Sequence, residues 1–202
     1  MRAWKAATDA IAPPAVAFGL RAAMAGETAR TRERVDLAWT GPRTGTNLLP
    51  RTDQALLSVI RGAKESLFIV TFAAYRVEAI RREVAAAAAR GVAVSLVVET
   101  DDGPDGRIDF AALAALVDSA SAVRVYEWPV EVRPRSNGRH GTLHAKCAIA
   151  DGDTMFVSSA NLTEHAMEIN LELGVVVRGG DAPGAVARHF TALMAAGVLR
   201  AR

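Results

Sequence analysis

Residues 144–161 read HAKCAIADGDTMFVSSAN, and this stretch decides how the rest of the chain is interpreted. A short apolar run is followed by Asp151 and Gly152, a dipeptide typical of two-residue β-hairpin turns. Apolar residues resume after the turn. The stretch therefore predicts a β-hairpin whose first strand covers residues 144–150.

The hairpin sets which polar side chains share a face. If residue 150 pairs with residue 153 across a two-residue turn, His144 lies opposite Ser159. Side chains alternate along a strand, so His144 and Lys146 point to the same side. The pattern therefore predicts an imidazole, an ammonium and a hydroxyl on one face of the hairpin.

Further polar residues follow the hairpin. Asn161 stands where the chain leaves the second strand, and Glu164 three residues later suggests a helix start with a capping box. Free N–H groups at such a helix start favour an anion. Asn170 and Glu172 share one face of a predicted strand over residues 170–177. If that strand lies beside the hairpin, Glu172 can reach His144.

This set of groups suits a phosphate ester. Lysine is scarce here, at three of 24 basic residues, so Lys146 in a strand is unusual and fits a compact phosphate ligand. A carboxylate on one imidazole nitrogen would leave the other free to attack phosphorus. Each residue also has a plainer interpretation. A His and a Lys two apart also occur on the wet face of an edge strand, Asn161 can simply cap a helix, and Asp151 fits a turn residue better than a catalyst.

The remaining sequence alternates strands and helices. Strands are predicted over residues 35–39, 66–72, 92–99 and 122–128. Helices are predicted after an N-cap at Thr52 or Asp53 and over residues 77–90, 109–118 and 183–197, the last with an apolar stripe of Val186, Phe190, Leu193 and Met194. Residues 100–107 are a turn-rich acidic loop. The order predicts an α/β sandwich with a mixed central sheet flanked by helices. We expect one domain over residues 35–202, preceded by a helical N-terminal extension over residues 1–34 that is broken at Pro13-Pro14.

The amino-acid composition excludes several classes of protein. The hydrophobic content of 50% supports a sizeable core, and the single Cys147 excludes an internal disulfide framework or a multi-cysteine metal site. The net charge of +2 says little about partners. No run is long and apolar enough to span a bilayer, so we expect no stable membrane insertion. The single cysteine fits a reducing compartment, and we expect a cytoplasmic protein. The alternative is a signal peptide over residues 1–25, which would imply a periplasmic or secreted protein.

The spacing as a whole resembles the phospholipase D superfamily. Its motif is H-x-K, four residues, D, six residues and G-S-x-N, and the matching residues here are His144, Lys146, Asp151, Ser158, Ser159 and Asn161. Ser158 replaces the usual Gly, a small-for-small change that we expect to be tolerated. Asn170 and Glu172 also match the family. Within the superfamily, the chain is similar to small bacterial endonucleases and to a phospholipase-D-like component of some bacterial anti-phage defence systems.

The resemblance implies a mechanism. His144 would form a covalent phosphohistidine, Lys146, Ser159, Asn161 and Glu172 would complete the catalytic group, and Asp151 and Asn170 would support it. A second histidine would protonate the leaving oxygen. No other histidine here stands in an H-x-K motif, so a homodimer with both motifs at its two-fold axis is the simplest solution. The mechanism needs neither a metal ion nor another cofactor.

A basic segment leads into the motif. Residues 133–141 read RPRSNGRHG and contain Arg133, Arg135 and Arg139, which either track phosphates in a flexible loop or are simply solvated. We expect a metal-independent phosphodiesterase that acts on nucleic acid, with DNA favoured over RNA. The alternatives are a phospholipid phosphodiesterase and a non-catalytic nucleic-acid-binding component of a defence complex with other proteins.

Overall fold

The structure is a computed structural model that describes residues 13–42, 45, 49–71, 74–75, 78–99, 122–163, 166 and 168–202. The predicted acidic loop at residues 100–107 and the predicted helix at residues 109–118 lie outside the described residues. So does Glu164, the predicted partner of Asn161 in a capping box.

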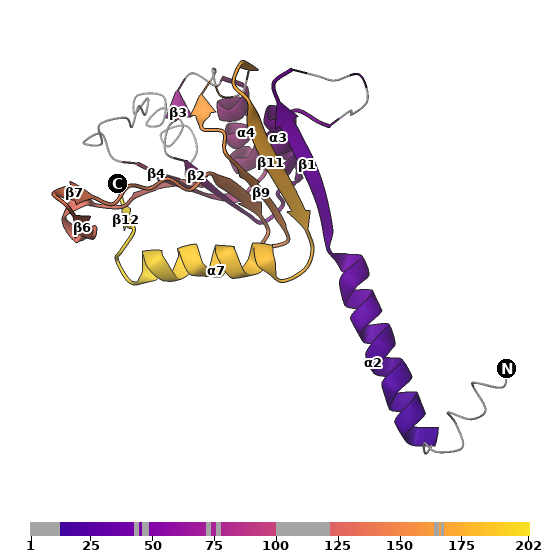
Figure 1. The fold of residues 1–202 in the computed structure, drawn as a ribbon. Coiled ribbons are helices and arrows are strands. Elements are labelled where there is room, and N and C mark those ends of the chain that lie inside the picture. Colours follow the sequence, from indigo (N-terminus) through magenta and orange to yellow (C-terminus); the bar gives the residue numbers. More distant parts are fainter. Residues whose placement is uncertain are drawn as a thin grey trace.

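The centre of the molecule is an eight-stranded mixed sheet in the order β1-β11-β9-β8-β2-β4-β5-β12 (Figure 1). Its strands are β1 (Arg34–Thr40), β2 (Ser66–Thr71), β4 (Ala93–Val98), β5 (Val123–Glu127), β8 (Cys147–Ala150), β9 (Thr154–Ser158), β11 (Glu172–Arg178) and β12 (Arg200–Ala201). β2, β4 and β5 are parallel, and the other neighbouring pairs are antiparallel. The predicted α/β sandwich with a mixed sheet is therefore confirmed.

Two short ribbons lie apart from this sheet. β3 (Ala74–Tyr75) pairs in parallel with β10 (Leu162–Thr163), and β6 (Arg135–Ser136) pairs antiparallel with β7 (Arg139–His140). A single 3-10 turn, η1 (Val130–Val132), precedes β6.

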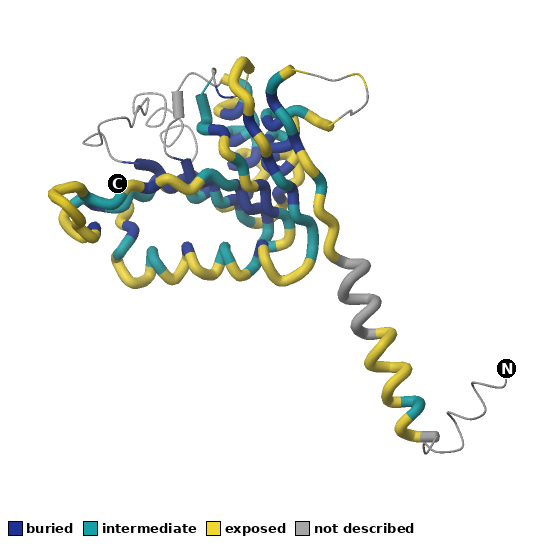
Figure 2. The backbone as a smooth tube through the Cα atoms, viewed as in Figure 1, coloured by how far each residue is buried: buried dark blue, intermediate teal, exposed yellow. Residues whose placement is uncertain are grey.

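Helices cover both faces of the sheet. α3 (Thr52–Gly62) and α4 (Glu78–Ala89) lie on one face, and α7 (Ala182–Ala195) crosses the other (Figure 1). Figure 2 shows the buried residues concentrated between these layers. The predicted apolar stripe of α7 is confirmed: its buried and half-buried members pack against sheet residues of the second core cluster, and they are Val186, Phe190, Leu193 and Met194.

The start of α3 differs from the prediction by one residue. Arg51 is the N-cap, and no side chain caps the helix there. Thr52 is already helical and buried, and its hydroxyl hydrogen-bonds to that of Thr40 at the end of β1. Thr52 therefore serves as a tether between β1 and α3, a tertiary role that its capping propensity does not reveal.

The N-terminal helix α2 (Pro13–Arg32) leads away from the body of the molecule (Figure 1). It begins at Pro13, which is tolerated in a first helical turn, so the Pro pair opens a helix here. Among the described residues, no helix has the length and apolar character needed to cross a membrane.

The motif hairpin differs from its predicted register. The first strand begins at Cys147, so His144 and Lys146 precede it, and Ala150 pairs with Thr154. Asp151 and Gly152 do adopt the left-handed conformation of a tight turn, with φ of 56° and 64°. The extra residue is Asp153, whose carbonyl accepts a 2.8 Å hydrogen bond from the N–H of Gly179 at the end of β11.

Candidate functional site

The H-x-K residues lie in an extended segment that leads into β8. Lys146 is half-buried, and its Nζ donates a 2.9 Å hydrogen bond to the carbonyl oxygen of His144. The carbonyl of Lys146 accepts a 3.1 Å hydrogen bond from the N–H of Ser158. The lysine side chain is thus turned back toward the backbone of the histidine, while His144 itself is exposed.

Glu172 connects the predicted site residues. This buried carboxylate accepts hydrogen bonds from the Ser159 hydroxyl and, at 3.1 Å, from Nδ2 of Asn170. Burial lowers the pKa of Lys146, and the negative charge of Glu172 partly offsets that shift. The structure therefore brings Ser159 and Asn170 together on one carboxylate, whose negative charge also acts on Lys146.

The residue that departs from the family motif makes contacts of its own. The Ser158 hydroxyl accepts a 3.0 Å hydrogen bond from the N–H of Ala160 and donates to the carbonyl of Leu173 at 3.3 Å. Ser159 exchanges further hydrogen bonds with the backbone of Leu173, through its N–H at 3.1 Å and its hydroxyl at 3.2 Å. These bonds fasten the end of β9 to the start of β11, so Ser158 is compatible with the local fold.

Asn161 does not begin a helix, contrary to the prediction. It directly precedes β10, where the Oγ1 of Thr163 accepts a 3.3 Å hydrogen bond from the N–H of Ala166. The Oδ1 atom of Asn161 is buried and has no hydrogen-bond partner among the residues that the structure describes. A buried amide oxygen in that state is suited to a donor supplied by a ligand.

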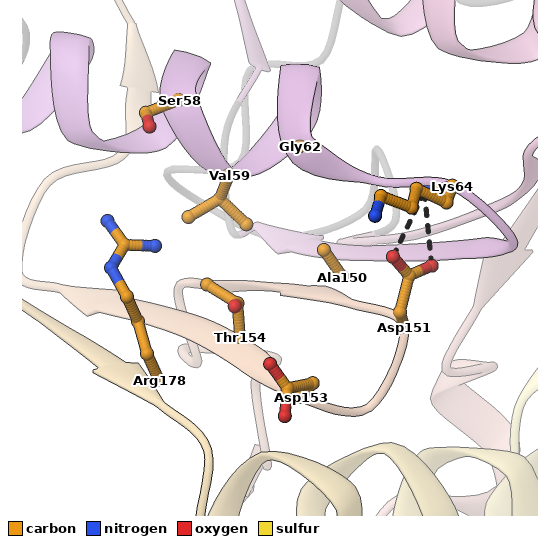
Figure 3. Close-up of a pocket in the computed structure, with 9 residues that line it drawn as sticks. All are labelled: Ser58, Val59, Gly62, Lys64, Ala150, Asp151, Asp153, Thr154 and Arg178. Atoms are coloured by element: carbon orange, nitrogen blue, oxygen red, sulfur yellow. Dashed lines mark hydrogen bonds between the residues drawn. The ribbon is translucent and has the colours of Figure 1, made fainter. Parts of the chain in front are cut away.

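Asp151 lies at the opposite end of β8 from His144 and anchors the hairpin. Its carboxylate accepts a hydrogen bond from the backbone N–H of Lys64 at 3.0 Å (Figure 3). It also accepts hydrogen bonds from the N–H groups of Glu65 and Ser66, at 2.8 and 2.9 Å. Burial alone would raise the pKa of this carboxyl, but the three N–H donors outweigh it and the net pKa is lowered. The contacts give Asp151 a structural role, in line with its interpretation as a turn residue.

A cavity of about 190 Å³ adjoins this anchor (Figure 3). Its charged lining residues balance, since Lys64 and Arg178 are matched by Asp151 and Asp153. Thr154 and residues of α3 complete the wall. The cavity therefore lies at the turn end of the hairpin, away from the H-x-K segment, and has no net preference for an anion.

The basic segment is ordered, and one of its arginines is not available to a ligand. Arg133 is buried and ion-paired with Glu99, which contradicts its predicted role in nucleic-acid binding. Arg135 and Arg139 are exposed on the β6–β7 hairpin, which turns at Asn137 with a φ of 50°. The predicted flexible loop is thus a short hairpin that presents two arginines.

Sequence reasoning missed the role of Glu99. It ends the predicted strand over residues 92–99 and was given no role, yet it is 0% exposed, and besides Arg133 its carboxylate binds the backbone N–H of Leu143, next to His144. An acidic residue directly after the buried strand β4 was the available signal, because a buried carboxylate requires a partner.

Two other features bear on chemistry. Burial raises the pKa of the Cys147 thiol to about 11, so the thiolate needed for nucleophilic attack is scarce at neutral pH. In the part of the chain that the structure describes, no group of three or more His, Cys, Asp and Glu side chains gathers as metal ligands would.

An exposed apolar patch begins beside the site. Ile169, Leu171 and Leu173 are 70%, 66% and 50% exposed, and they alternate with Asn170 and Glu172 in sequence. The patch continues onto the neighbouring strands with exposed residues of β1 and β9, namely Val35, Leu37 and Val157. Strand alternation directs Leu173 to the face of β11 opposite the Glu172 carboxylate.

Comparison with known proteins assigns the class. Residues 56–194 match the model of the family described as "Cardiolipin synthase, PLD-like domain". The chain therefore belongs to the phospholipase D-like family, and the matched range includes the whole H-x-K, Asp and S-x-N motif.

Particular relatives support the assignment. The chain is 31% identical over 142 residues to the 5'-3' exonuclease PLD3 of Bos taurus, an alignment that covers 63% of this chain but only 27% of that protein. It shares the fold of the phospholipase D family member Nuc from Salmonella typhimurium, with a TM-score of 0.61 and 23% identity over 84% of this chain and 98% of Nuc. NucT from Helicobacter pylori gives a TM-score of 0.63 and 19% identity over 79% of this chain and 94% of NucT.

Proposed function

We propose that the chain is a metal-independent phosphodiesterase, most specifically a nuclease, that works through a phosphohistidine at His144. The observation that carries this is the buried Glu172, which joins Ser159 and Asn170 by hydrogen bonds and Lys146 by charge. An imidazole nitrogen of His144 attacks phosphorus as the bond to the leaving oxygen breaks. Water then attacks the same phosphorus, the N–P bond breaks, and the free histidine returns.

Charge on the phosphate oxygens would be met by donors of this chain. The ammonium of Lys146 supplies a positive charge, and the amide of Asn161 and the hydroxyl of Ser159 supply hydrogen bonds. Each of these roles is filled by a side chain, so none calls for a divalent ion.

The leaving oxygen needs a proton donor, and we propose that it comes from a second copy of the chain. His189 lies on α7, which packs on a sheet face through Phe190, and does not stand in a second H-x-K motif. A two-fold homodimer would bring two copies of the motif together. The exposed Ile169 and Leu171 support such a contact, because these apolar residues flank Asn170 of the site.

Nucleic acid is the substrate class we favour, with DNA ahead of RNA. Arg135 and Arg139 are exposed on the β6–β7 hairpin, where they can neutralise phosphates. The relative PLD3 carries the name of an exonuclease. Because the chain spans about a quarter of that relative, its substrate does not transfer automatically.

A phospholipid substrate is the second candidate, and one observation favours it. A lipid phosphodiesterase would present an apolar rim at its site, and the exposed Ile169 and Leu171, which flank Asn170, would form that rim. In a homodimer, the partner chain would cover these exposed residues. In a lipid enzyme, they would contact the membrane surface.

One set of assays separates these functions. Plasmid and single-stranded DNA are incubated with the protein in excess EDTA, beside vesicles with a labelled headgroup. We expect DNA cleavage that survives EDTA and weakens as salt rises, because phosphate contacts release counterions. Headgroup release without DNA cleavage would identify the lipid enzyme, and binding without turnover the non-catalytic module of a complex.

The nucleophile is tested by His144→Ala, with His189→Ala as the matched control. We expect the first variant to lose turnover and to retain no acid-labile, base-stable label from ³²P substrate, while the control keeps both. Cleavage at the wild-type rate by a folded His144→Ala protein would refute the proposal.

Two experiments test the dimer: mixing wild-type and variant chains, and introducing a charged residue into the proposed interface. Heterodimers of wild-type and His144→Ala chains should show strongly reduced activity per wild-type chain. Leu171→Glu should shift the protein toward monomer and lower activity, whereas Val132→Glu, at an exposed apolar residue on η1, should do neither. A fully active wild-type monomer would contradict the two-histidine mechanism.

A further inference from the structure

The segment that carries the proposed nucleophile has little strand pairing of its own. Residues 141–146 precede β8 and have no regular secondary structure, so the ladder of a sheet does not fix them. On its C-terminal side the segment is held by the hydrogen bond from Ser158 to Lys146. Something else must hold its N-terminal side, because a displacement of about 1 Å at a nucleophile can lower a rate by roughly 100-fold.

A buried ion pair occupies that position. The side chains of Glu99 and Arg133 are 0% and 2% exposed and are bonded to each other. Glu99 Oε2 accepts a 2.6 Å hydrogen bond from the N–H of Leu143, and Arg133 Nη1 donates a 3.1 Å hydrogen bond to the carbonyl of Gly141. The pair therefore forms hydrogen bonds with the backbone of Gly141 and Leu143, shortly before His144.

The pair is itself fixed from two other parts of the fold. Glu99 follows directly on the central strand β4, whose buried residues belong to the core. Arg133 Nε donates a 2.8 Å hydrogen bond to the carbonyl of Trp128, and the guanidinium lies 5.3 Å from the centre of the Trp128 ring. Both charges thus have several partners, as a buried ion pair requires.

We infer that Glu99 and Arg133 are positioning residues, which hold residues 141–146 so that His144 is presented to the phosphate. They act through the backbone of Leu143 and Gly141 and need not touch the substrate. This inference rests on the proposed function, since it assigns His144 as the group to be positioned. It also explains why an arginine of the basic segment is buried.

The test must separate positioning from stability. A buried pair can often be replaced by apolar residues of similar size without loss of stability. The double variant Glu99→Leu with Arg133→Met therefore removes both backbone contacts at little expected cost to folding. Glu99→Gln keeps an acceptor for Leu143 but removes the charge. The matched control is Glu131→Leu with Arg200→Met, which removes the exposed 2.6 Å ion pair between η1 and β12.

Single-turnover formation of the phosphohistidine and steady-state kcat and KM are measured for each folded variant. We expect kcat to fall about 100-fold or more in the double variant at nearly constant KM, and about 10-fold in Glu99→Gln. The control should match the wild type. A kcat within threefold of wild type in either folded variant, or a loss confined to KM, would overturn the inference. If the double variant does not fold, Glu99→Gln decides by the same criteria.

Hydrogen exchange gives a readout independent of activity. The backbone amides of residues 141–146 should exchange at least 10-fold faster in Glu99→Gln than in the wild type and the control. Unchanged exchange would overturn the inference even if the enzyme is active. A wild type that forms no adduct at His144 would instead contradict the proposed function alone, because the exchange rates still report whether the pair holds this segment.

Discussion

Replacing Asp151 tests whether this residue of the motif stabilises the fold or takes part in catalysis. Asp151 has a φ of 56°, so Asn and Gly are the two substitutes that tolerate its backbone conformation. Its Oδ1 accepts hydrogen bonds from the N–H groups of Glu65 and Ser66, and the N–H of Lys64 is shared between Oδ2 at 3.0 Å and Oδ1 at 3.2 Å. Asn can keep the first two bonds but turns an NH₂ group toward Lys64, whereas Gly loses all three.

The expected loss in unfolding free energy follows from these contacts. A hydrogen bond contributes about 0.5–1.5 kcal/mol net, and water can reach the exposed amides of Lys64 and Glu65, so Asp151→Asn should cost about 1 kcal/mol and Asp151→Gly about 2 kcal/mol. For a domain of this size, 1 kcal/mol corresponds to about 2–4 °C in Tm. Thermal unfolding at neutral pH should therefore show losses of about 2–4 °C and 4–8 °C. Because β8 separates Asp151 from His144 by roughly 20 Å, kcat per folded molecule should stay within about twofold.

The pH dependence has a definite sign. The folded-state pKa of Asp151 is lowered by its N–H donors, so its contribution is fully present above the unfolded-state pKa of about 3.9 and is lost as pH falls below that value. The difference in unfolding free energy between wild type and Asp151→Asn should be constant from about pH 8 to pH 5 and shrink toward pH 3. A large loss of kcat with unchanged Tm would refute the anchoring role and make Asp151 a catalyst.

Three further outcomes are expected. Lys146→Arg should lower kcat/KM by at least about 10-fold, because a longer forked group cannot repeat the compact contact of Nζ with the His144 carbonyl. Near-wild-type activity would mean that Lys146 contributes only its positive charge. Gly174→Ala should cost about 1–3 kcal/mol in urea unfolding, since its Cβ would lie 2.5 Å from Cε2 of Phe156, and unchanged stability would mean that the ring moves aside freely. Cys147 should resist iodoacetamide at pH 8 in the folded protein and react after unfolding, because its pKa is about 11; rapid labelling of the native protein would contradict its burial.

The sequence predicted the architecture well because its signals were local. Buried strands such as β2 and β4 are continuous apolar runs, and the apolar stripe of α7 has a clear helical period. Gly91, with a φ of 88°, follows α4 as a helix stop signal should. Each of these patterns is set by a few neighbouring residues.

Whether each of the three arginines is buried or exposed depends on residues far away in the sequence, so it could not be predicted from the local pattern. Arg133 and Arg135 are two apart in the same basic segment, yet one is buried and the other exposed. What separates them is Glu99, which reaches Arg133 from the end of β4. Charge patterning can locate a basic segment, but only the fold decides which of its members already has a buried partner.

The motif hairpin shows how a correct grouping can follow from an incorrect register. A two-residue turn would have placed Ser159 opposite His144, but three residues, Asp151 to Asp153, separate the paired Ala150 and Thr154, so the register is shifted by one residue. A shift of one residue normally sends a side chain to the other face. Ser159 escapes this rule because it lies beyond the end of β9, where its hydroxyl is directed by Glu172 and by the backbone of Leu173. The site is therefore held by the contact between the ends of β9 and β11, so substitutions at that contact should disturb the site more than substitutions in the turn.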